Sequence, residues 1–376
     1  MSEILEYKCP ACGGAMEFDS ATQKMKCPYC DTEISVKDYQ KAMKGQRETD
    51  TPNEPAFEEA DGAAGSEYNA WEANSSGEWM EGETDGMRIY SCKSCGGEIV
   101  AEETTGATTC PFCGNRVVMK GQFSGDLRPD YIIPFKLDKK AAKAAYQKHL
   151  KGKPFLPKIF KKENHIDEIK GVYVPFWVFD AEVDANITYN AEKTRTWEER
   201  GLEYTEHNYY ELQRRGSIRF EKVPTDCSKK MDDNLMESIE PYNFSDAVPF
   251  ETAYLAGYLA DRYDVEPEKC IGRATKRAKT STEFSFSSTI DGYQSVAPAQ
   301  SNIRVKSAKY WYTLYPVWIL NTTWNKKKFI FAMNGQTGKM VGDLPSDQKE
   351  FWKYVVKRGL CISVLLYVLQ WMLVLA

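Results

Sequence analysis

The chain has 376 residues, a formal net charge of −5 and eleven cysteines. Its length allows two or more domains. Twelve acidic residues and no lysine or arginine occur between Glu48 and Met87. Outside this stretch the chain is therefore near neutral to mildly basic, which does not suggest a dedicated nucleic-acid binder.

The N-terminal part carries two copies of one cysteine pattern, offset by 83 positions. In each copy, fourteen residues separate two CxxC pairs: Cys9, Cys12, Cys27 and Cys30, then Cys92, Cys95, Cys110 and Cys113. Two CxxC knuckles bring four thiolates around one tetrahedral zinc ion, and a site closed by four protein ligands is structural. The sequence therefore predicts two structural Zn²⁺ ions and no catalytic metal.

Two alternatives exist for these cysteines. A disulfide framework is disfavoured because residues 1–10 have neither a basic start nor an apolar run, so we expect no secretory signal and reduced thiols. A thioredoxin-like redox role does not explain four pairs at matched spacing.

Glycines after the knuckles agree with zinc, because a positive φ turns backbone amides toward thiolate sulfur. They are Gly13, Gly14, Gly96, Gly97 and Gly114. At the corresponding place after Cys30 stands Asp31, which tolerates this conformation less well.

Five segments follow from this organisation. They are zinc ribbon 1 (1–40), an acidic flexible linker (41–87), zinc ribbon 2 (88–122), a duplicated α+β domain (123–347), and a basic flank with a transmembrane anchor (348–376). The linker is poor in aliphatic residues, so burial cannot offset its ordering entropy. Its aromatic residues Tyr68, Trp71 and Trp79 either dock on a partner or on ribbon 2, or are incidental.

The body looks duplicated, with halves at about 131–240 and 241–347. A Pro-Phe pair precedes each of two predicted helices, 137–150 and 251–263. Farther on, Pro175-Phe-Trp matches Pro316-Val-Trp within strand-like sequence. The helix offset of 115 and the strand offset of 141 differ, so an insertion is assumed.

Antiparallel strands are expected around these anchors. Apolar and polar residues alternate over 184–192 and 209–220, which is typical of half-buried strands. The segment 334–338 contains glycine and predicts a hairpin between 328–333 and 339–341. Pro175 and Pro316 cannot donate to a ladder, so we expect edge positions or bulges there.

Residues 360–376 carry no charge, and basic residues precede them. Seventeen helical residues reach about 25 Å, slightly less than a hydrocarbon core of about 30 Å, so a single transmembrane helix is marginal but feasible. The basic flank predicts that ribbons and body stay cytoplasmic. A core helix of the folded domain is the alternative.

Catalytic motifs are scarce. The chain has no HExxH motif and no phosphate-binding loop, and its three histidines, His149, His165 and His207, are isolated. Weaker candidates are a reactive Cys227 beside two lysines, a cation site at Asp226, Asp232 and Asp233, and a basic helical patch at Arg273, Lys276, Arg277 and Lys279. An inert thiol, a helix start and a solvated face are the plainer interpretations.

Several phrases carry a resemblance to a known family. The ribbons read CPACGG, CPYC, CKSCGG and CPFCGN, and the body reads YVPFWVFDAE, KVPTDCSKKMDD, SIEPYNFSDAVPFETAYLAGYLADRYDV and FAMNGQTGKMVGDLP. Over nearly its whole length the chain resembles the bacterial TFIIB-type zinc-ribbon membrane proteins. Some members accompany phage-shock and band-7 membrane-stress proteins, which implies an adaptor role at the membrane.

The resulting hypothesis is a non-enzymatic scaffold, anchored in the cell membrane through 360–376, whose ribbons bind protein partners. Nucleic-acid recognition by the ribbons is an alternative that is not favoured. An enzyme with a pocket in the duplicated domain is a further alternative, although no small-molecule substrate is evident.

Overall fold

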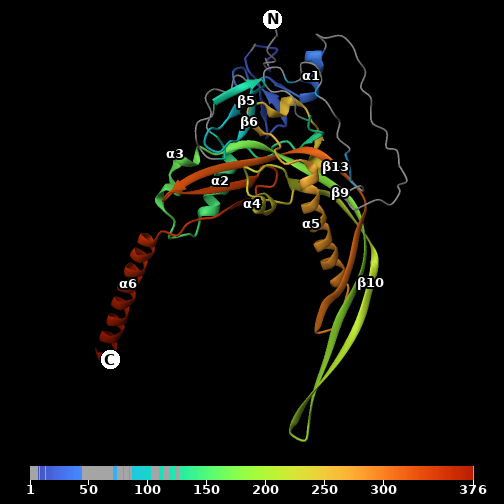
Figure 1. Ribbon diagram of the computed structural model, residues 1–376. Coiled ribbons are helices and arrows are strands. Elements are labelled where there is room, and N and C mark those ends of the chain that lie inside the picture. Colours follow the sequence, from blue (N-terminus) through green and yellow to red (C-terminus); the bar gives the residue numbers. More distant parts are fainter. Residues whose placement is uncertain are drawn as a thin grey trace.

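The computed structural model (Figure 1) describes residues 7, 9–12, 14–44, 71–73, 79, 84, 87–102, 110–112, 118–122 and 127–375. Its elements in chain order are β1 (Glu17–Asp19), β2 (Lys24–Lys26), β3 (Glu33–Ile34), α1 (Val36–Lys44), β4 (Trp71–Ala73), β5 (Met87–Ser91), β6 (Glu98–Glu102), β7 (Val118–Gln122), β8 (Tyr131–Ile132), α2 (Lys139–Leu150), η1 (Lys158–Lys161), α3 (Glu163–Ile166), β9 (Lys170–Glu199), β10 (Leu202–Asp226), α4 (Asp233–Ser238), η2 (Phe244–Asp246), β11 (Val248–Pro249), η3 (Thr252–Leu255), β12 (Leu259–Asp261), α5 (Pro267–Ser287), β13 (Ser295–Trp324), β14 (Lys327–Asn334), β15 (Met340–Gly342) and α6 (Gln348–Leu375). The fold is mixed α and β with mainly antiparallel strands.

Two long strands organise the body. β9 and β13 pair antiparallel from Ser295 opposite Glu192 to Ile319 opposite Lys170. β10 returns antiparallel along β9, and the outer parts of these strands form an arm that projects from the body (Figure 1). The alternating segments 184–192 and 209–220 lie within β9 and β10, which confirms the predicted strands. The predicted hairpin is also confirmed, as β14 and β15.

The register of β9 on β13 relates the two Pro-x-Trp segments by a local two-fold axis. Pro175 lies opposite Leu314, and Pro316 lies opposite Tyr173. The flanking strands follow the same relation, because β12 pairs parallel with β9 and β8 pairs parallel with β13. Each tryptophan also donates its indole N–H to a backbone carbonyl just before a helix, Trp177 to Val265 at 3.0 Å and Trp318 to Leu137 at 2.9 Å.

The proline of each segment stands in the interior of the sheet, so the expectation of an edge position or a bulge is wrong. On the outer side of β9, β12 pairs as far as Tyr173, and the pairing with β10 starts at Phe176. On the outer side of β13, β8 pairs as far as Leu314, and the pairing with β14 starts at Val317. Each proline therefore occupies the gap between two neighbouring strands, where no ladder N–H is required.

Of the two predicted helices, the first is confirmed as α2, and the second, 251–263, is wrong. That segment forms the short turn η3 followed by β12, and Gly257 between them has φ +83°. Ala260 pairs with Tyr173 on one side and with Val100 on the other. Sheet pairing thus outweighs the local helix preference of the segment. The helix that corresponds to α2 is α5, which begins with Pro267, a favoured first residue of a helix.

The local two-fold axis relates two units of the body, one built around β9 and the other around β13. Aromatic side chains fill the interface between these two units. The ring of Phe135 stacks on Tyr258 with centroids 4.2 Å apart, and its centroid lies 5.0 Å from that of Tyr173 and 5.2 Å from that of Trp318. Phe135, Tyr173 and Trp177 are fully buried. Such packing leaves the junction of the units filled by side chains.

The acidic linker lies mostly outside the described residues, and so does Tyr68. Two of its described parts contact the body. β4, which begins at Trp71, pairs parallel with β13 at Ala308 to Tyr310. The ring of Trp79 packs edge-on against Phe250 at 5.7 Å. These two aromatic positions therefore contact the body.

The last helix, α6, projects from the body as a separate rod (Figure 1). Among helices built from described residues, none combines the length and the apolar character that a bilayer crossing requires. The predicted anchor, 360–376, ends in positions whose side chains lie outside the described residues. The single-pass anchor therefore stays a prediction.

The two-fold places Asp226, at the end of β10, in correspondence with Asn334, at the end of β14, because they lie opposite Phe176 and Val317. Asn334 donates to the carbonyls of Ile239 and Pro241. Asp226 is 2% exposed, and its Oδ2 has no hydrogen-bond partner within the part of the chain that the structure describes. Burial raises the pKa of Asp226 well above its ordinary value.

This difference predicts a pH dependence of stability. The folded pKa of Asp226 lies above the unfolded pKa of about 3.9, so its contribution to stability falls as pH rises, by about 1.4 kcal/mol per pH unit, until the folded pKa is reached. Asp226→Asn cannot ionise. We expect its free energy of unfolding, relative to the unsubstituted chain, to increase from pH 4.5 to pH 7.5 in urea titrations.

The control is Asp291→Asn, which makes the same change at an exposed position. It should show no such trend, since no buried carboxyl group is removed. A constant difference between Asp226→Asn and the unsubstituted chain across this range would contradict the prediction.

Candidate metal centres

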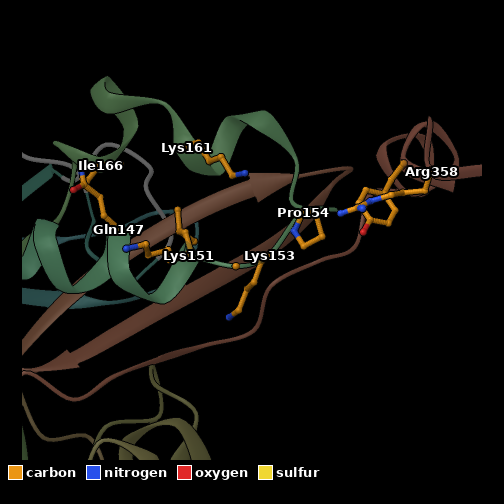
Figure 2. A pocket seen from close by; sticks show the side chains of 10 residues that line it. Gln147, Lys151, Lys153, Pro154, Lys161, Ile166 and Arg358 are labelled. Atoms are coloured by element: carbon orange, nitrogen blue, oxygen red, sulfur yellow. The ribbon is translucent and has the colours of Figure 1, made fainter. Parts of the chain in front are cut away.

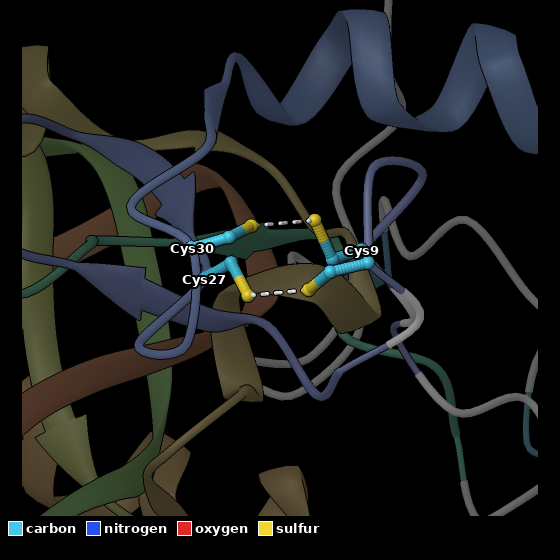
Figure 3. Close-up of side chains that lie close together, drawn as sticks. Cys9, Cys27 and Cys30 are labelled. Atoms are coloured by element: carbon cyan, nitrogen blue, oxygen red, sulfur yellow. Dashed lines mark hydrogen bonds between the residues drawn. The ribbon is translucent and has the colours of Figure 1, made fainter.

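Ribbon 1 brings four thiols together. The Sγ atoms of Cys9, Cys12, Cys27 and Cys30 all lie within 4.8 Å of one another. Figure 3 shows the two closest pairs, Cys9 with Cys30 and Cys12 with Cys27, each at 3.5 Å. A disulfide would require about 2.05 Å, whereas two thiolates on one tetrahedral zinc stand about 3.8 Å apart, given Zn–S bonds of about 2.3 Å. The arrangement therefore fits a tetrathiolate metal site.

Backbone turns hold the knuckles of ribbon 1. The N–H of Cys9 donates to the Gly14 carbonyl at 2.7 Å, and the N–H of Asp31 donates to the Cys27 carbonyl at 2.9 Å. Asp31 has φ +56°, so it adopts the left-handed conformation expected of a glycine at this place. Hydrogen bonds from Thr32, whose hydroxyl lies 3.1 Å from Cys30 Sγ, lower the pKa of Cys30, whereas the pKa of the neighbouring Cys12 is raised by the thiols that face it.

Ribbon 2 repeats this construction. The Sγ atoms of Cys92, Cys95 and Cys110 form a second group within 4.8 Å, and Cys95 lies 3.6 Å from Cys110. The N–H of Cys92 donates to the Gly97 carbonyl at 2.8 Å, and Gly96 has φ +72°. Cys113, the predicted fourth ligand, lies outside the described residues, as do Gly13 and Gly114. Both cysteine groups can bind a metal ion.

In both ribbons the two cysteines of a knuckle have different exposures. The first cysteine of each of the four knuckles is buried, at Cys9, Cys27, Cys92 and Cys110. The second is exposed at every described position, at Cys12, Cys30 and Cys95. Each centre is thus anchored from inside and reaches the protein surface on its other side.

Ribbon 1 docks on the segment that replaces the predicted second helix. The N–H of Phe18 donates to the Ala256 carbonyl, and the Phe18 ring packs edge-on against Tyr254. The side chain of Gln23 donates to the Phe135 carbonyl at 2.7 Å. Ribbon 1 therefore contacts the aromatic residue at the centre of the body.

Ribbon 2 is part of the body sheet. β5 and β6 pair antiparallel, and β6 pairs with β12 through Val100 opposite Ala260 and Ile99 opposite Asp261. The side chains of Cys92, Cys110 and Phe112 belong to a buried cluster that includes residues of β9 and β13. The predicted flexible tether between the ribbons accordingly joins two docked modules.

A buried polar cluster, which the sequence did not predict, fixes ribbon 2 to the body. Asp261 is 2% exposed, and its carboxylate accepts from the Ser228 hydroxyl and from Lys230 Nζ, each at 2.5 Å. Lys230 Nζ also donates to the Glu98 carbonyl in β6, and Arg262 forms an ion pair with Glu98 at 2.8 Å. Burial raises the pKa of Asp261, whereas Lys230 opposes this shift. The one available signal was a lone aspartate at the end of the apolar run 255–260.

The other sequence candidates have structural roles. Cys227 is fully buried and burial raises its pKa, so it is not an activated thiol. Asp232 caps α4 by accepting from the Leu235 N–H. Arg273 pairs with Asp233 at 2.8 Å, and Arg277 pairs with Glu240 at 2.7 Å, so both arginines of the suggested basic patch are engaged in ion pairs.

The three histidines lie on different elements and have different partners. His149 in α2 contacts the Gly342 carbonyl, and burial lowers its pKa. His165 in α3 contacts Glu168 and Thr322. His207 in β10 contacts Glu192. None of these contacts joins two histidines.

The fold and both cysteine groups define a class: proteins in which two cysteine metal centres dock on one mixed α and β body. No family model matches the chain, and no solved structure matches it. The chain is 33% identical over 342 residues to "Uncharacterized protein YdjG" of Bacillus subtilis (strain 168). The match covers 91% of this chain and 90% of that protein, so the chain belongs to the YdjG family.

The metal content provides a direct test of the two centres. We expect about two zinc ions per purified chain by mass spectrometry of the metal, because each ribbon offers thiolates at tetrahedral spacing. Cys30→Ser removes one ligand of ribbon 1 and should reduce the content to about one. Cys361→Ser, at an exposed cysteine on α6, is the control and should keep about two. Equal zinc contents in all three proteins would contradict the assignment.

Proposed function

We propose that the protein is a membrane-attached scaffold, without enzymatic activity, that presents two zinc-stabilised knuckle surfaces to a protein partner. The observation that carries this proposal is the exposure of α6. Beyond Gly359, five of its aliphatic side chains are between 55% and 68% exposed: Leu360, Ile362, Val364, Leu365 and Leu366. A contiguous apolar surface of this kind marks an interaction site in a folded protein.

Membrane attachment explains the composition of α6 on both sides of Gly359. Lys349, Lys353, Lys357 and Arg358 precede the apolar stretch, and no charged residue follows them. Basic residues beside an apolar segment favour the cytoplasmic face. The proposal therefore places α6 in the bilayer and the body on its cytoplasmic side.

The scaffold role is supported by the coordination expected at the two cysteine centres. Four protein ligands close a zinc site to substrate, which supports a structural metal. In ribbon 1 the second knuckle contains Tyr29, whose side chain is 76% exposed and lies against Gly14. An exposed aromatic residue on a rigid support is a common anchor at protein interfaces. The filled aromatic junction of the two units also supports a non-enzymatic role.

Attachment through α6 predicts the distribution of the protein between membrane and soluble fractions. Two lysines in the apolar stretch, Leu365→Lys with Leu366→Lys, should release the full chain from membranes, since each lysine at the centre of a bilayer helix costs about 3 kcal/mol. Leu202→Lys changes a leucine that is 61% exposed, close to the 62% of Leu366, and should leave the distribution unchanged. Recovery of the unsubstituted chain in the soluble fraction would refute attachment.

The role of the knuckle predicts a loss of partner binding. Cross-linking in detergent-solubilised membranes should capture at least one protein with the unsubstituted chain and not with Tyr29→Ser. Tyr209→Ser removes a tyrosine that is 77% exposed on the arm and is the matched control, which should still capture that protein. If all three chains capture the same proteins in equal amounts, Tyr29 is not part of the contact surface.

A further inference from the structure

A lysine-rich segment without acidic residues borders a hollow at the start of α6. Between Lys139 and Lys162 the chain has nine lysines and no aspartate or glutamate. This stretch forms α2, a loop and η1. The concentration of one charge there is unusual for a chain whose formal net charge is negative.

The hollow lies where the end of α2, η1 and α6 meet, and it has a volume of about 600 Å³ (Figure 2). Four cationic side chains line it, Lys151, Lys153, Lys161 and Arg358, together with Gln147 and Tyr354. No acidic residue is among the lining residues. We refer to this hollow as the basic pocket.

Contacts of Phe155 hold the two walls of the basic pocket together. The Phe155 ring packs edge-on against Phe351 at 5.2 Å and against Tyr354 at 5.3 Å, both on α6. The Asp347 N–H donates to the Phe155 carbonyl at 2.8 Å. Arg358 lies one helical turn beyond Tyr354 and places its guanidinium 5.3 Å from the centre of that ring. Packing of Phe155 on α6 thus brings Arg358 to the pocket, beside Tyr354.

The four cations have no acidic partner among the described residues. Lysines nearby do have one: Lys143 pairs with Asp167 and Lys136 pairs with Asp246, each at 2.6 Å. Four like charges around one hollow repel one another, and a bound anion would remove this repulsion. An arginine fork beside lysine ammonium groups is the donor set that recognises a phosphate group.

The position of the pocket indicates where the phosphate comes from. Arg358 is followed after Gly359 by the exposed apolar side chains that begin at Leu360. If that stretch enters the bilayer, the pocket lies at the depth of the lipid headgroups. We propose that the basic pocket binds the phosphate group of an anionic lipid headgroup. This inference rests on the proposed attachment of α6 to the membrane.

The test uses the full chain and flotation with two kinds of vesicle, phosphatidylcholine alone and phosphatidylcholine mixed with phosphatidylglycerol. The unsubstituted chain should bind the mixed vesicles at least roughly 30-fold more tightly, which is the contribution expected of two basic residues near an anionic surface. Lys151→Gln with Lys161→Gln should weaken binding to the mixed vesicles roughly 30-fold, given the contribution of each basic residue near an anionic surface. Binding to phosphatidylcholine alone should not change.

The matched control is Lys139→Gln with Lys140→Gln, which removes the same charge from exposed positions at the other end of α2. It should keep the preference for the mixed vesicles, and if it loses the preference to the same extent, the pocket is not the site. Equal binding of the unsubstituted chain to both vesicles would overturn the lipid site and leave the attachment of α6 intact.

A calorimetric titration with inorganic phosphate at constant ionic strength separates the remaining cases. Binding of phosphate by the unsubstituted chain, lost in the pocket variant, together with no binding to either vesicle, would assign the pocket to free phosphate and overturn both the lipid site and the attachment. Absence of binding in both experiments would overturn both as well.

Discussion

The antiparallel pairing of β9 with β13 is the constraint on which the rest of the structure depends. Its register places the Pro-x-Trp segments around a local two-fold axis. On its outer side, β9 pairs with β12 and β10, and β13 pairs with β8 and β14. Through β12 this pairing reaches β6, so that ribbon 2 becomes the continuation of the same sheet. Ribbon 2, with its cysteine group, and the body thus share one hydrogen-bonded sheet.

Features that depend on local spacing could be predicted from the sequence. A CxxC knuckle determines where its two thiols lie, and alternation within a strand determines which side chains face the protein. Seven of the eight predicted cysteine ligands, all except Cys113, and the strands at 184–192 and 209–220 are therefore found as expected. The segment 251–263 has apolar residues at helical spacing, but its conformation depends on pairing with Tyr173 and Val100, which are distant in sequence. Local preference does not contain that information.

The polar cluster and the basic pocket were missed for the same reason. Ser228 and Asp261 are separated by 33 positions, and Arg358 reaches the lysines of η1 only because Phe155 packs against α6. The lysine-rich composition between Lys139 and Lys162 is visible in the sequence. The composition does not show that Tyr354 and Arg358 of α6 form the second wall, and so it does not distinguish a solvated helix face from a hollow lined by cations.

Pairing of ribbon 2 with β12 gives the metal an influence beyond its own module. β12 has only three residues and lies between β9 and β6. A ribbon too small to hold a core folds together with its metal. Loss of the ion from ribbon 2 would therefore uncover the backbone N–H and C=O groups of β12 on the side of β6. An uncovered strand edge is a template for association between chains, so loss of the metal would expose an edge of the sheet that is prone to aggregation.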